Sequence, residues 1–320
     1  MQPSVSVIIP IYKAEEYLPK FLHSLFGQSL SNVEYIFIDD CSPDRSIEVI
    51  NNILDSYINR RSQVQIIHHK SNRGVSASRQ DGLERVKGEY VIHCDPDDWI
   101  DNNFLEELYL TAKKENSDVV FCDFSYEKYG YSRRVCQKPT EYNSSRVLCE
   151  LFVRLHGSTC NKLIKTSKIR QLKLAFDPNF NFCEDLLFNT KLFLHTLAIS
   201  YTDKTQYHYR CCINSNSVVR NYNMSSFQLD KNLAKTILNL VKETSAKSYC
   251  RQNMAYLIAW RAFIGNCFTS KEYKENILPY LKDILSGNIQ FLQKLLLISS
   301  SIGLYRLTYS LYTRLKKFKR

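Results

Sequence analysis

Short apolar runs alternate with amphipathic segments along the first part of the chain. The runs are too short for helices and are rich in β-branched and aromatic residues, which predicts strands. The segments between them carry apolar residues three or four positions apart, which predicts helices. The predicted strands cover residues 5–12, 34–38, 64–67, 90–94 and 118–122, and the predicted helices cover residues 18–25, 47–54 and 75–85. Alternating strands and helices form a mainly parallel sheet flanked by helices, so we expect an α/β fold.

An acidic run follows one of these strands directly. Asp95, Asp97 and Asp98 come straight after the apolar residues 90–94. Three carboxylates at the exit of a buried strand repel one another and lose solvation, so they are costly unless a hard cation or a charged ligand binds there. The end of a strand also faces the crevice in which open α/β sheets bind ligands. The run predicts a metal or nucleotide site, and the alternative is a surface turn that caps the next helix.

A second acidic pair, Asp39 and Asp40, follows the predicted strand 34–38 and precedes a turn. Two parallel strands would therefore deliver acids to the same edge of the sheet. Asp40 could instead cap the next helix, although Ser42 and Asp44 stand in better positions to do so.

The sequence contains neither a G-x-G-x-x-G after the first strand nor a G-x-x-x-x-G-K-[ST] motif. Phosphate groups would therefore be held by a cation and side chains instead of a glycine-rich loop.

Five segments in this order resemble glycosyltransferase family 2, whose members are inverting, metal-dependent enzymes with the Rossmann-like GT-A fold that use nucleotide-diphosphate sugars. The segments are SVIIPIY, IFIDDCSPD, NRGVSASRQDG, GEYVIHCDPDDW and CEDLLF. The resemblance covers about residues 4–220. It implies a GT-A catalytic domain over residues 1–220. Helical periodicity predicts a helical extension over residues 221–285, and the charge and apolar spacing predict a basic amphipathic tail over residues 286–320.

The resemblance also implies roles for individual residues. Tyr12 would flank the nucleobase, Asp40 would accept a hydrogen bond from a base N–H, and Arg79 would help to hold the nucleotide. Asp97 and Asp98 would bind Mn²⁺ or Mg²⁺ against the diphosphate. The residues expected to bind the nucleotide sugar are Pro10, Tyr12, Glu15, Asp40, Arg79, Asp95, Asp97, His208 and Arg210. Without the family context, Arg79 would be a solvated helix residue, and the segment 207–210 would be an ordinary half-exposed strand.

Glu184 and Asp185 match the family's catalytic acid pair, and Asp185 is the expected base. Both precede an apolar helix, so the alternative is a pair that only caps it. Cys183 stands where the family often has Gly, and residues 160–165 resemble a segment whose polar turn lines the acceptor side.

The expected reaction is inverting transfer from a UDP-sugar to a glycan or lipid-linked acceptor in cell-surface polysaccharide synthesis. The alternative is a non-catalytic nucleotide-sugar-binding or scaffolding protein with the same fold.

The cysteines and the first apolar run bear on localisation. The 11 cysteines are scattered without C-x-x-C pairs, which favours reduced thiols in a cytosol over a disulfide framework or zinc site. The first apolar run is the first predicted strand and carries Pro10, so we expect no signal peptide. The expected location is cytoplasmic, with contact at the inner face of the cell membrane left open.

The C-terminal tail is basic and amphipathic, and much of the net charge of +11 lies there. No acid follows Asp283, whereas the basic residues after it are Lys294, Arg306, Arg314, Lys316, Lys317, Lys319 and Arg320. The apolar residues Leu304, Leu307, Leu311, Leu315 and Phe318 recur every three or four positions. Such a helix could lie on an anionic membrane surface with its tyrosines near the headgroups, or pack on the protein itself. Nucleic acid is not an expected partner, because the apolar stripe offers no means of reading bases.

Overall fold

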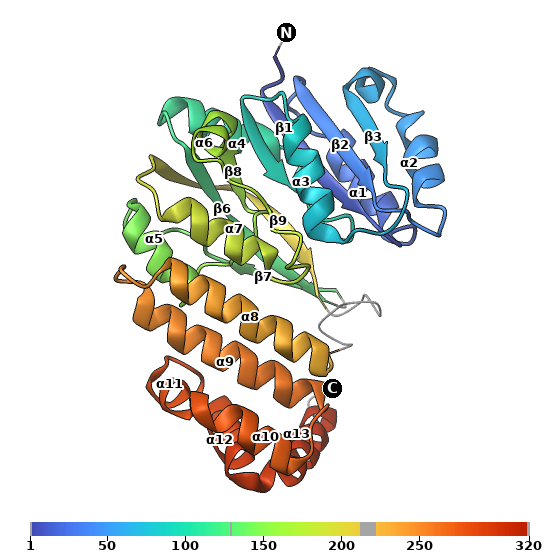
Figure 1. Cartoon of the computed structure of the whole chain (residues 1–320). Helices are drawn as coiled ribbons and strands as arrows, with labels where there is room; N and C mark the ends of the chain where they lie inside the picture. Colours follow the sequence, from blue (N-terminus) through green and yellow to red (C-terminus); the bar gives the residue numbers. More distant parts are fainter. Residues whose placement is uncertain (1, 129, 212–221, 319–320) are drawn as a thin grey trace. The chain divides into compact units, whose positions relative to one another are not determined.

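The computed structural model describes residues 2–128, 130–211 and 222–318. The chain forms two compact units, Met1–Asn214 and Ser215–Arg320 (Figure 1). The first unit contains a nine-stranded mixed sheet, and the second unit consists of helices in its described part.

The sheet of the first unit has the strand order β3-β2-β1-β4-β8-β6-β9-β5, with β7 paired to β6. Its strands are β1 (Val5–Ile11), β2 (Val33–Asp39), β3 (Val64–His68), β4 (Tyr90–His93), β5 (Trp99–Ile100), β6 (Val119–Lys128), β7 (Tyr131–Val135), β8 (Lys162–Lys165) and β9 (Ile199–Arg210). The half formed by β3, β2, β1 and β4 is parallel throughout. In the other half, β8 pairs antiparallel with both β4 and β6, whereas β9 lies parallel to β6.

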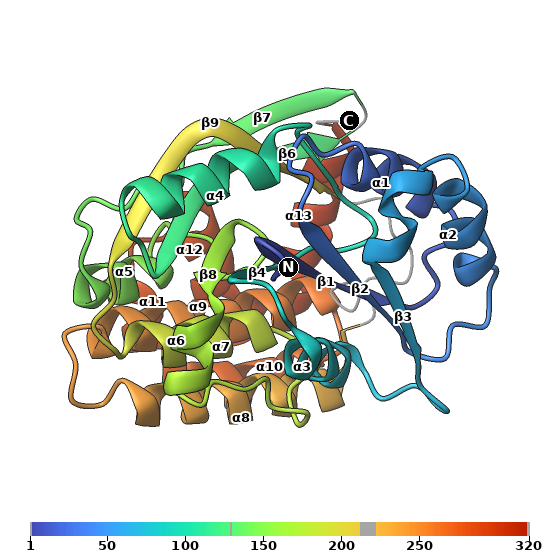
Figure 2. The same cartoon turned by 90° about the horizontal axis from the view of Figure 1, so that it is seen from above.

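Helices cover both faces of this sheet. They are α1 (Leu18–Phe26), α2 (Ser46–Leu54), the 3-10 helix η1 (Ile58–Gln63), α3 (Val75–Arg85), α4 (Phe104–Lys114), α5 (Ser144–Leu151), α6 (Thr166–Gln171) and α7 (Glu184–Phe193). In Figure 2, α1, α2 and α4 lie on one side of the sheet, and α3, α6 and α7 lie on the other. Side chains alternate across β1, so Val7 packs with α1 and α4 while Ile8 points toward α3. A Cβ on Gly82 would lie 2.5 Å from Ile8 Cγ2, so this glycine lets α3 approach the sheet closely.

The strands and helices predicted for the first 125 residues are present, and the α/β fold with flanking helices is confirmed. Pro10 is buried inside β1, although proline usually disrupts an inner strand. The Ile8 carbonyl accepts from the Cys94 N–H at the end of β4 (3.0 Å). The nitrogen of Pro10, two residues further along β1, is also directed toward β4 but lies beyond the last residue of that strand. The missing N–H of Pro10 therefore does not interrupt the hydrogen bonds between β1 and β4.

The second unit is helical, as predicted for this region. Its elements are α8 (Met224–Leu240), α9 (Lys247–Gly265), α10 (Ser270–Ile277), the 3-10 helix η2 (Leu278–Tyr280), α11 (Leu281–Ser286), α12 (Phe291–Ser299), the π-turn η3 (Ser300–Leu304) and α13 (Tyr305–Phe318). Gly303 (φ 104°) provides the bend that joins α12 to α13. Across the described ranges, none of the helices is both long enough and apolar enough to cross a bilayer.

The tyrosines of α13 pack into the second unit, as in the alternative in which this helix packs on the protein itself. Tyr305 is fully buried and stacks on Tyr273 of α10 (4.5 Å between ring centroids). Tyr309 and Tyr312 contact Phe263 of α9 edge-on. Leu304, Leu307 and Leu311 face outward instead and are 47%, 60% and 51% exposed. The side chains of residues 315–318, and residues 319–320 altogether, lie outside the described part, so the contributions expected from Leu315, Phe318 and the last four basic residues stay predictions.

Candidate active site

The carboxyl ends of β1, β2 and β4 meet at one edge of the sheet. The Asp40 N–H donates to the Ile11 carbonyl (2.9 Å) and joins the end of β2 to that of β1. The Cys94 N–H makes the corresponding bond to Ile8 and joins β4 to β1. The two acidic segments therefore leave the sheet side by side, as the alternation of strands and helices predicts.

Arg79 on α3 is the centre of a buried ion cluster at this edge. Its Nη2 donates to Asp95 Oδ1 (2.6 Å), and its Nη1 donates to Asp185 Oδ1 (2.6 Å) and to Glu184 Oε1. Only 3% of the Arg79 side chain is exposed. The structure therefore directs this guanidinium to the carboxylates that follow β4 and begin α7, and its contact with a nucleotide stays a prediction.

Glu184 and Asp185 begin α7 and differ in accessibility. The Glu184 side chain is 9% exposed and the Asp185 side chain 16%. Burial raises the pKa of Glu184 to about 7, although the positive charge of Arg79 acts to lower it. Burial raises the pKa of Asp185 in the same way. Thr159 Oγ1 and Arg79 both donate to Asp185 Oδ1. A raised pKa makes a carboxylate a stronger base, so the geometry suits Asp185 as a group that accepts a proton.

Cys183 adopts the left-handed conformation that its family resemblance suggests. It is the residue before α7 and has φ 55°, a value that favours glycine. A residue with a Cβ costs about 1 kcal/mol in this conformation. The turn therefore forms with cysteine, at a small cost in stability.

The acidic run after β4 has one deeply buried member. Asp98 is 1% exposed, and its Oδ2 accepts from the Tyr207 hydroxyl (2.8 Å) while its Oδ1 accepts from the Arg210 N–H (2.8 Å). Burial and the charges of Asp97 and Asp95 raise the pKa of Asp98. Asp98 thus ties the acidic segment to β9, whereas Asp97 is only half-buried.

The donor set fits a divalent cation that is bound together with phosphate. Within the described ranges, no three His, Cys, Asp or Glu side chains converge as a complete metal site. Mg²⁺ is usually held by one or two carboxylates plus the phosphates of a substrate. Asp97 is half-buried and would provide a carboxylate of this kind. Both oxygens of the buried Asp98 already accept hydrogen bonds from β9, so its direct contact with a metal stays a prediction.

Asp40 is buried and holds the loop that precedes α3. It is 2% exposed, and its carboxylate accepts from the backbone N–H groups of Arg73 and Gly74 (2.7 Å each) and contacts His69 Nδ1 (2.7 Å). Its alternative role as a helix cap is not realised, because α2 begins at Ser46 and Asp44 accepts the Ser46 N–H. Its hydrogen bond to a base stays a prediction.

The three residues expected from the first segment lie in different environments. Tyr12 follows β1 and is 44% exposed, so its ring is accessible for stacking. Glu15 instead pairs with Arg45 (2.6 Å), whose backbone N–H lowers the pKa of the Glu15 carboxyl. Pro10 is buried in β1. Of these three, Tyr12 is placed best to meet a ligand.

His208 and Arg210 lie at the end of β9 beside the acidic run. The His208 ring stacks on Trp99 (5.2 Å) and contacts Asp101 Oδ1 and Glu127 Oε1 (2.8 Å each). Although burial opposes it, these hydrogen bonds raise the pKa of His208. Both ring nitrogens are thus engaged by carboxylates, while the Arg210 guanidinium lies over the Trp99 ring.

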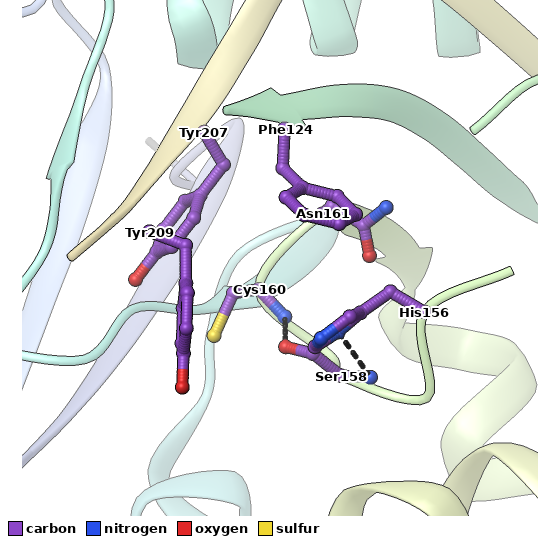
Figure 3. Close-up of a pocket in the computed structure, with 7 residues that line it drawn as sticks. All are labelled: Phe124, His156, Ser158, Cys160, Asn161, Tyr207 and Tyr209. Atoms are coloured by element: carbon purple, nitrogen blue, oxygen red, sulfur yellow. Dashed lines mark hydrogen bonds between the residues drawn. The ribbon is translucent and has the colours of Figure 1, made fainter. Parts of the chain in front are cut away.

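A pocket lies beside these carboxylates, and the sequence indicated only part of its lining, through the turn 160–165 and the segment 207–210. It is lined by Phe124, His156, Ser158, Cys160, Asn161, Tyr207 and Tyr209 (Figure 3). Cys160 Sγ lies 3.3 Å from Asp95 Oδ2, and Thr159 of the same loop donates to Asp185. The pocket therefore adjoins both the acidic run and the candidate base.

Lys162 holds the loop that forms one wall of this pocket. Its buried Nζ donates to the carbonyls of His156 (2.8 Å) and Ser158 (2.6 Å) and to Asn161 Oδ1 (2.9 Å). Burial lowers the pKa of Lys162 to about 7, while three oxygen acceptors match the three protons of its ammonium form. The only signal in the sequence was the polar turn at residues 160–165, which does not reveal burial.

Comparisons with known proteins identify relatives of this chain. The family model described as Glycosyl transferase family 2 matches residues 6–173. The Bacillus subtilis (strain 168) protein EpsH, named as a glycosyltransferase, is 28% identical over 269 residues, which are 82% of this chain and 76% of EpsH. The cholesterol galactosyltransferase of Borreliella burgdorferi is 29% identical over 312 residues, which are 88% of this chain and 83% of that protein.

Two solved structures have a similar fold. The crystal structure of S. aureus TarS 1-349 in complex with UDP-GlcNAc has a TM-score of 0.65 at 19% identity and covers 98% of this chain and 92% of that chain. The mannosyltransferase PcManGT from Pyrobaculum calidifontis, in complex with GDP-Man and Mn²⁺, has a TM-score of 0.58 at 12% identity and covers 99% of this chain and 85% of that chain. The chain belongs to glycosyl transferase family 2 and has the GT-A fold with a C-terminal helical region.

Proposed function

We propose that this protein transfers a sugar, with inversion, from a UDP-sugar to a glycan or lipid-linked acceptor in the synthesis of cell-surface polysaccharide. The observation that carries the proposal is the cluster in which Arg79 joins Asp95 to Asp185 beside a pocket. The UDP-GlcNAc bound by TarS supports the donor class. The name of the Borreliella relative supports a lipid acceptor. The ten free cysteines of the described chain are in keeping with a cytoplasmic site of action.

The geometry assigns a task to each group. Asp185 would take the proton of an acceptor hydroxyl in the pocket, and the oxygen would attack the anomeric carbon opposite the departing nucleoside diphosphate. Attack from that side inverts the configuration. Arg79 and Thr159 would hold Asp185 in orientation through its Oδ1. A Mn²⁺ or Mg²⁺ ion held by Asp97 and Asp98 would supply Lewis-acid neutralisation of the leaving diphosphate.

Nucleotide binding and donor turnover test this function. With Mn²⁺ present, we expect UDP and its sugars to raise the melting temperature by a few degrees, since ligands that bind the native state stabilise it by mass action. Release of UDP from one of these sugars, with water as acceptor, should accompany binding. No shift with any nucleotide from folded protein would favour the scaffolding alternative. Binding without turnover of any donor would favour the non-catalytic, sugar-binding alternative.

The outer face of α13 supports contact with an anionic membrane. Leu304 at the end of η3 and Leu307 and Leu311 of α13 form an exposed apolar stripe, and the neighbouring α12 exposes Phe291 (77%) and Leu292 (56%). No acidic residue follows Asp283, so the basic side chains of this region complement negatively charged headgroups. We propose that the second unit rests on the inner face of the cell membrane through this stripe.

Vesicle flotation tests the membrane contact. The triple substitution Leu304→Gln, Leu307→Gln and Leu311→Gln should abolish flotation with vesicles that contain phosphatidylglycerol, because it removes the apolar area that would be buried. A control triple, in which glutamine replaces Leu110, Leu229 and Leu278, changes leucines of similar exposure elsewhere (54%, 47% and 47%) and should float like the wild type. Equal flotation of the two variants would show that the stripe does not mediate binding to the vesicles.

A further inference from the structure

Two cations lie against a single indole ring beside the acidic run. Lys20 of α1 places its Nζ 2.9 Å from the centroid of the Trp99 ring. The guanidinium carbon of Arg210 lies 5.4 Å from the same centroid and 5.4 Å from the centroid of Tyr17. Three segments far apart in the sequence thus bring two positive charges to one aromatic ring.

The carboxylates around Lys20 and Arg210 form hydrogen bonds with other groups. His208 contacts Asp101 and Glu127, and Asp98 accepts from the Tyr207 hydroxyl and the Arg210 backbone. Among residues 2–128, 130–211 and 222–318, neither Lys20 nor the Arg210 guanidinium pairs with a carboxylate. Burial and the charge of Arg210 lower the pKa of Lys20, while the charge of Glu127 acts in the opposite direction. Two like charges held close together without a paired carboxylate repel each other, so an anion placed between them is stabilised.

The position of the pair indicates which anion. Trp99 directly follows Asp98, and the Arg210 N–H donates to Asp98 Oδ1 (2.8 Å), so the cations adjoin the carboxylates predicted to hold the metal. A diphosphate between these groups would meet the metal on one side and the cations on the other. A metal ion neutralises only part of the charge on a leaving nucleoside diphosphate, and side-chain cations stabilise the remainder. Lysine commonly binds phosphate as a point charge.

We propose that Lys20 and Arg210, supported by Trp99, form the binding site for the diphosphate of the nucleotide donor. The inference rests on the proposed function, because it takes a nucleoside diphosphate as ligand. Arg210 was expected from the family resemblance to bind the nucleotide sugar. Lys20 was not, and only the packing of α1 against β5, which pairs with β9, brings it to the site.

Comparison of UDP with uridine tests this site, because uridine lacks both phosphates. The variant Lys20→Gln should bind UDP about tenfold more weakly than the wild type, as expected for the loss of one charge-assisted contact. Its affinity for uridine should stay within about twofold of the wild type. Arg210→Gln should behave in the same way, since its backbone bond to Asp98 is retained. Calorimetry for UDP and an NMR titration for uridine supply the two affinities.

A matched control separates local from overall charge. Lys231 of the second unit also lies over an aromatic ring, with Nζ 5.5 Å from the Phe227 centroid, so Lys231→Gln makes the same change of charge elsewhere and should leave UDP affinity unchanged. Inorganic pyrophosphate should compete with UDP on the wild type and compete less well on Lys20→Gln. Unchanged UDP affinity in Lys20→Gln, or equal losses for UDP and uridine, would overturn the assignment. A wild type that binds no UDP would instead refute the proposed donor.

Discussion

The substitution Asp185→Asn is expected to slow donor turnover by about 10²–10⁴-fold, the usual contribution of a general base. The amide keeps the size of the side chain and can still contact Thr159, but it cannot accept the proton of the attacking hydroxyl. UDP affinity should change little, because Asp185 contacts Arg79 and Thr159 instead of the acidic run. Release of UDP from its sugar, measured together with UDP affinity, checks both parts.

Two further variants and a pH profile make the test specific. Glu184→Gln should slow turnover less than Asp185→Asn, because Glu184 is the less exposed of the two (9% against 16%). Asp97→Asn should slow turnover and also weaken UDP binding in the presence of Mn²⁺. Because burial raises the pKa of Asp185 and a base acts when deprotonated, the wild-type rate should rise with pH through a value above that of an exposed carboxyl. Full turnover by Asp185→Asn would show that this residue is not the base.

Replacing Arg79 with Met should lower the free energy of unfolding by about 3–5 kcal/mol, the usual cost of removing one partner from a buried ion cluster. Asp95, Glu184 and Asp185 would lose their shared cation while remaining in place. Donor turnover should fall as well, since the orientation of Asp185 depends on Arg79. Chemical denaturation of the variant and the wild type measures the loss.

The stability lost in Arg79→Met should be larger at high pH than at low pH. Without Arg79, the buried carboxyls have higher pKa values in the folded state than in the unfolded state. Their contribution to the free energy of unfolding is therefore intact at low pH and is lost as the pH rises. The variant should therefore differ from the wild type less at pH 5.5 than at pH 8, values on either side of the wild-type Glu184 pKa of about 7. Arg73→Met is the matched control: it breaks a half-exposed pair with Asp81 and should cost no more than about 1 kcal/mol. Equal losses for both variants would contradict the buried cluster.

The sequence predicted the parallel half of the sheet because that half is built from local patterns. The strands there are short and mainly apolar, and α1 and α2 each have a regular apolar face. Two segments that follow adjacent parallel strands must meet at one edge of the sheet, so the sequence alone places Asp40 and Asp95 together. The antiparallel strand β8 was not predicted, because residues 162–165 form a short run whose partners β4 and β6 are distant in the sequence.

Burial and partner choice were beyond the sequence. The pattern around Arg79 is equally typical of a surface helix, yet Gly82 lets α3 approach the sheet so closely that the guanidinium is enclosed among three carboxylates. Lys162 is another charged residue whose burial the sequence does not show. In α13 the sequence pattern marked the leucines as the apolar face, but the tyrosines are the side chains that pack inward.

The amino-acid sequence by itself determined the family, the α/β class and the edge of the sheet at which the acidic segments lie, because these depend on periodicity and on the order of short motifs. The tertiary structure decided which acids pair with Arg79, which carboxylate of the acidic run is buried, and that Lys20 joins Arg210 at Trp99. These features arise from contacts between segments that are tens of residues or more apart. Their free energies depend on distance and exposure, and neither quantity is contained in the local pattern of residues.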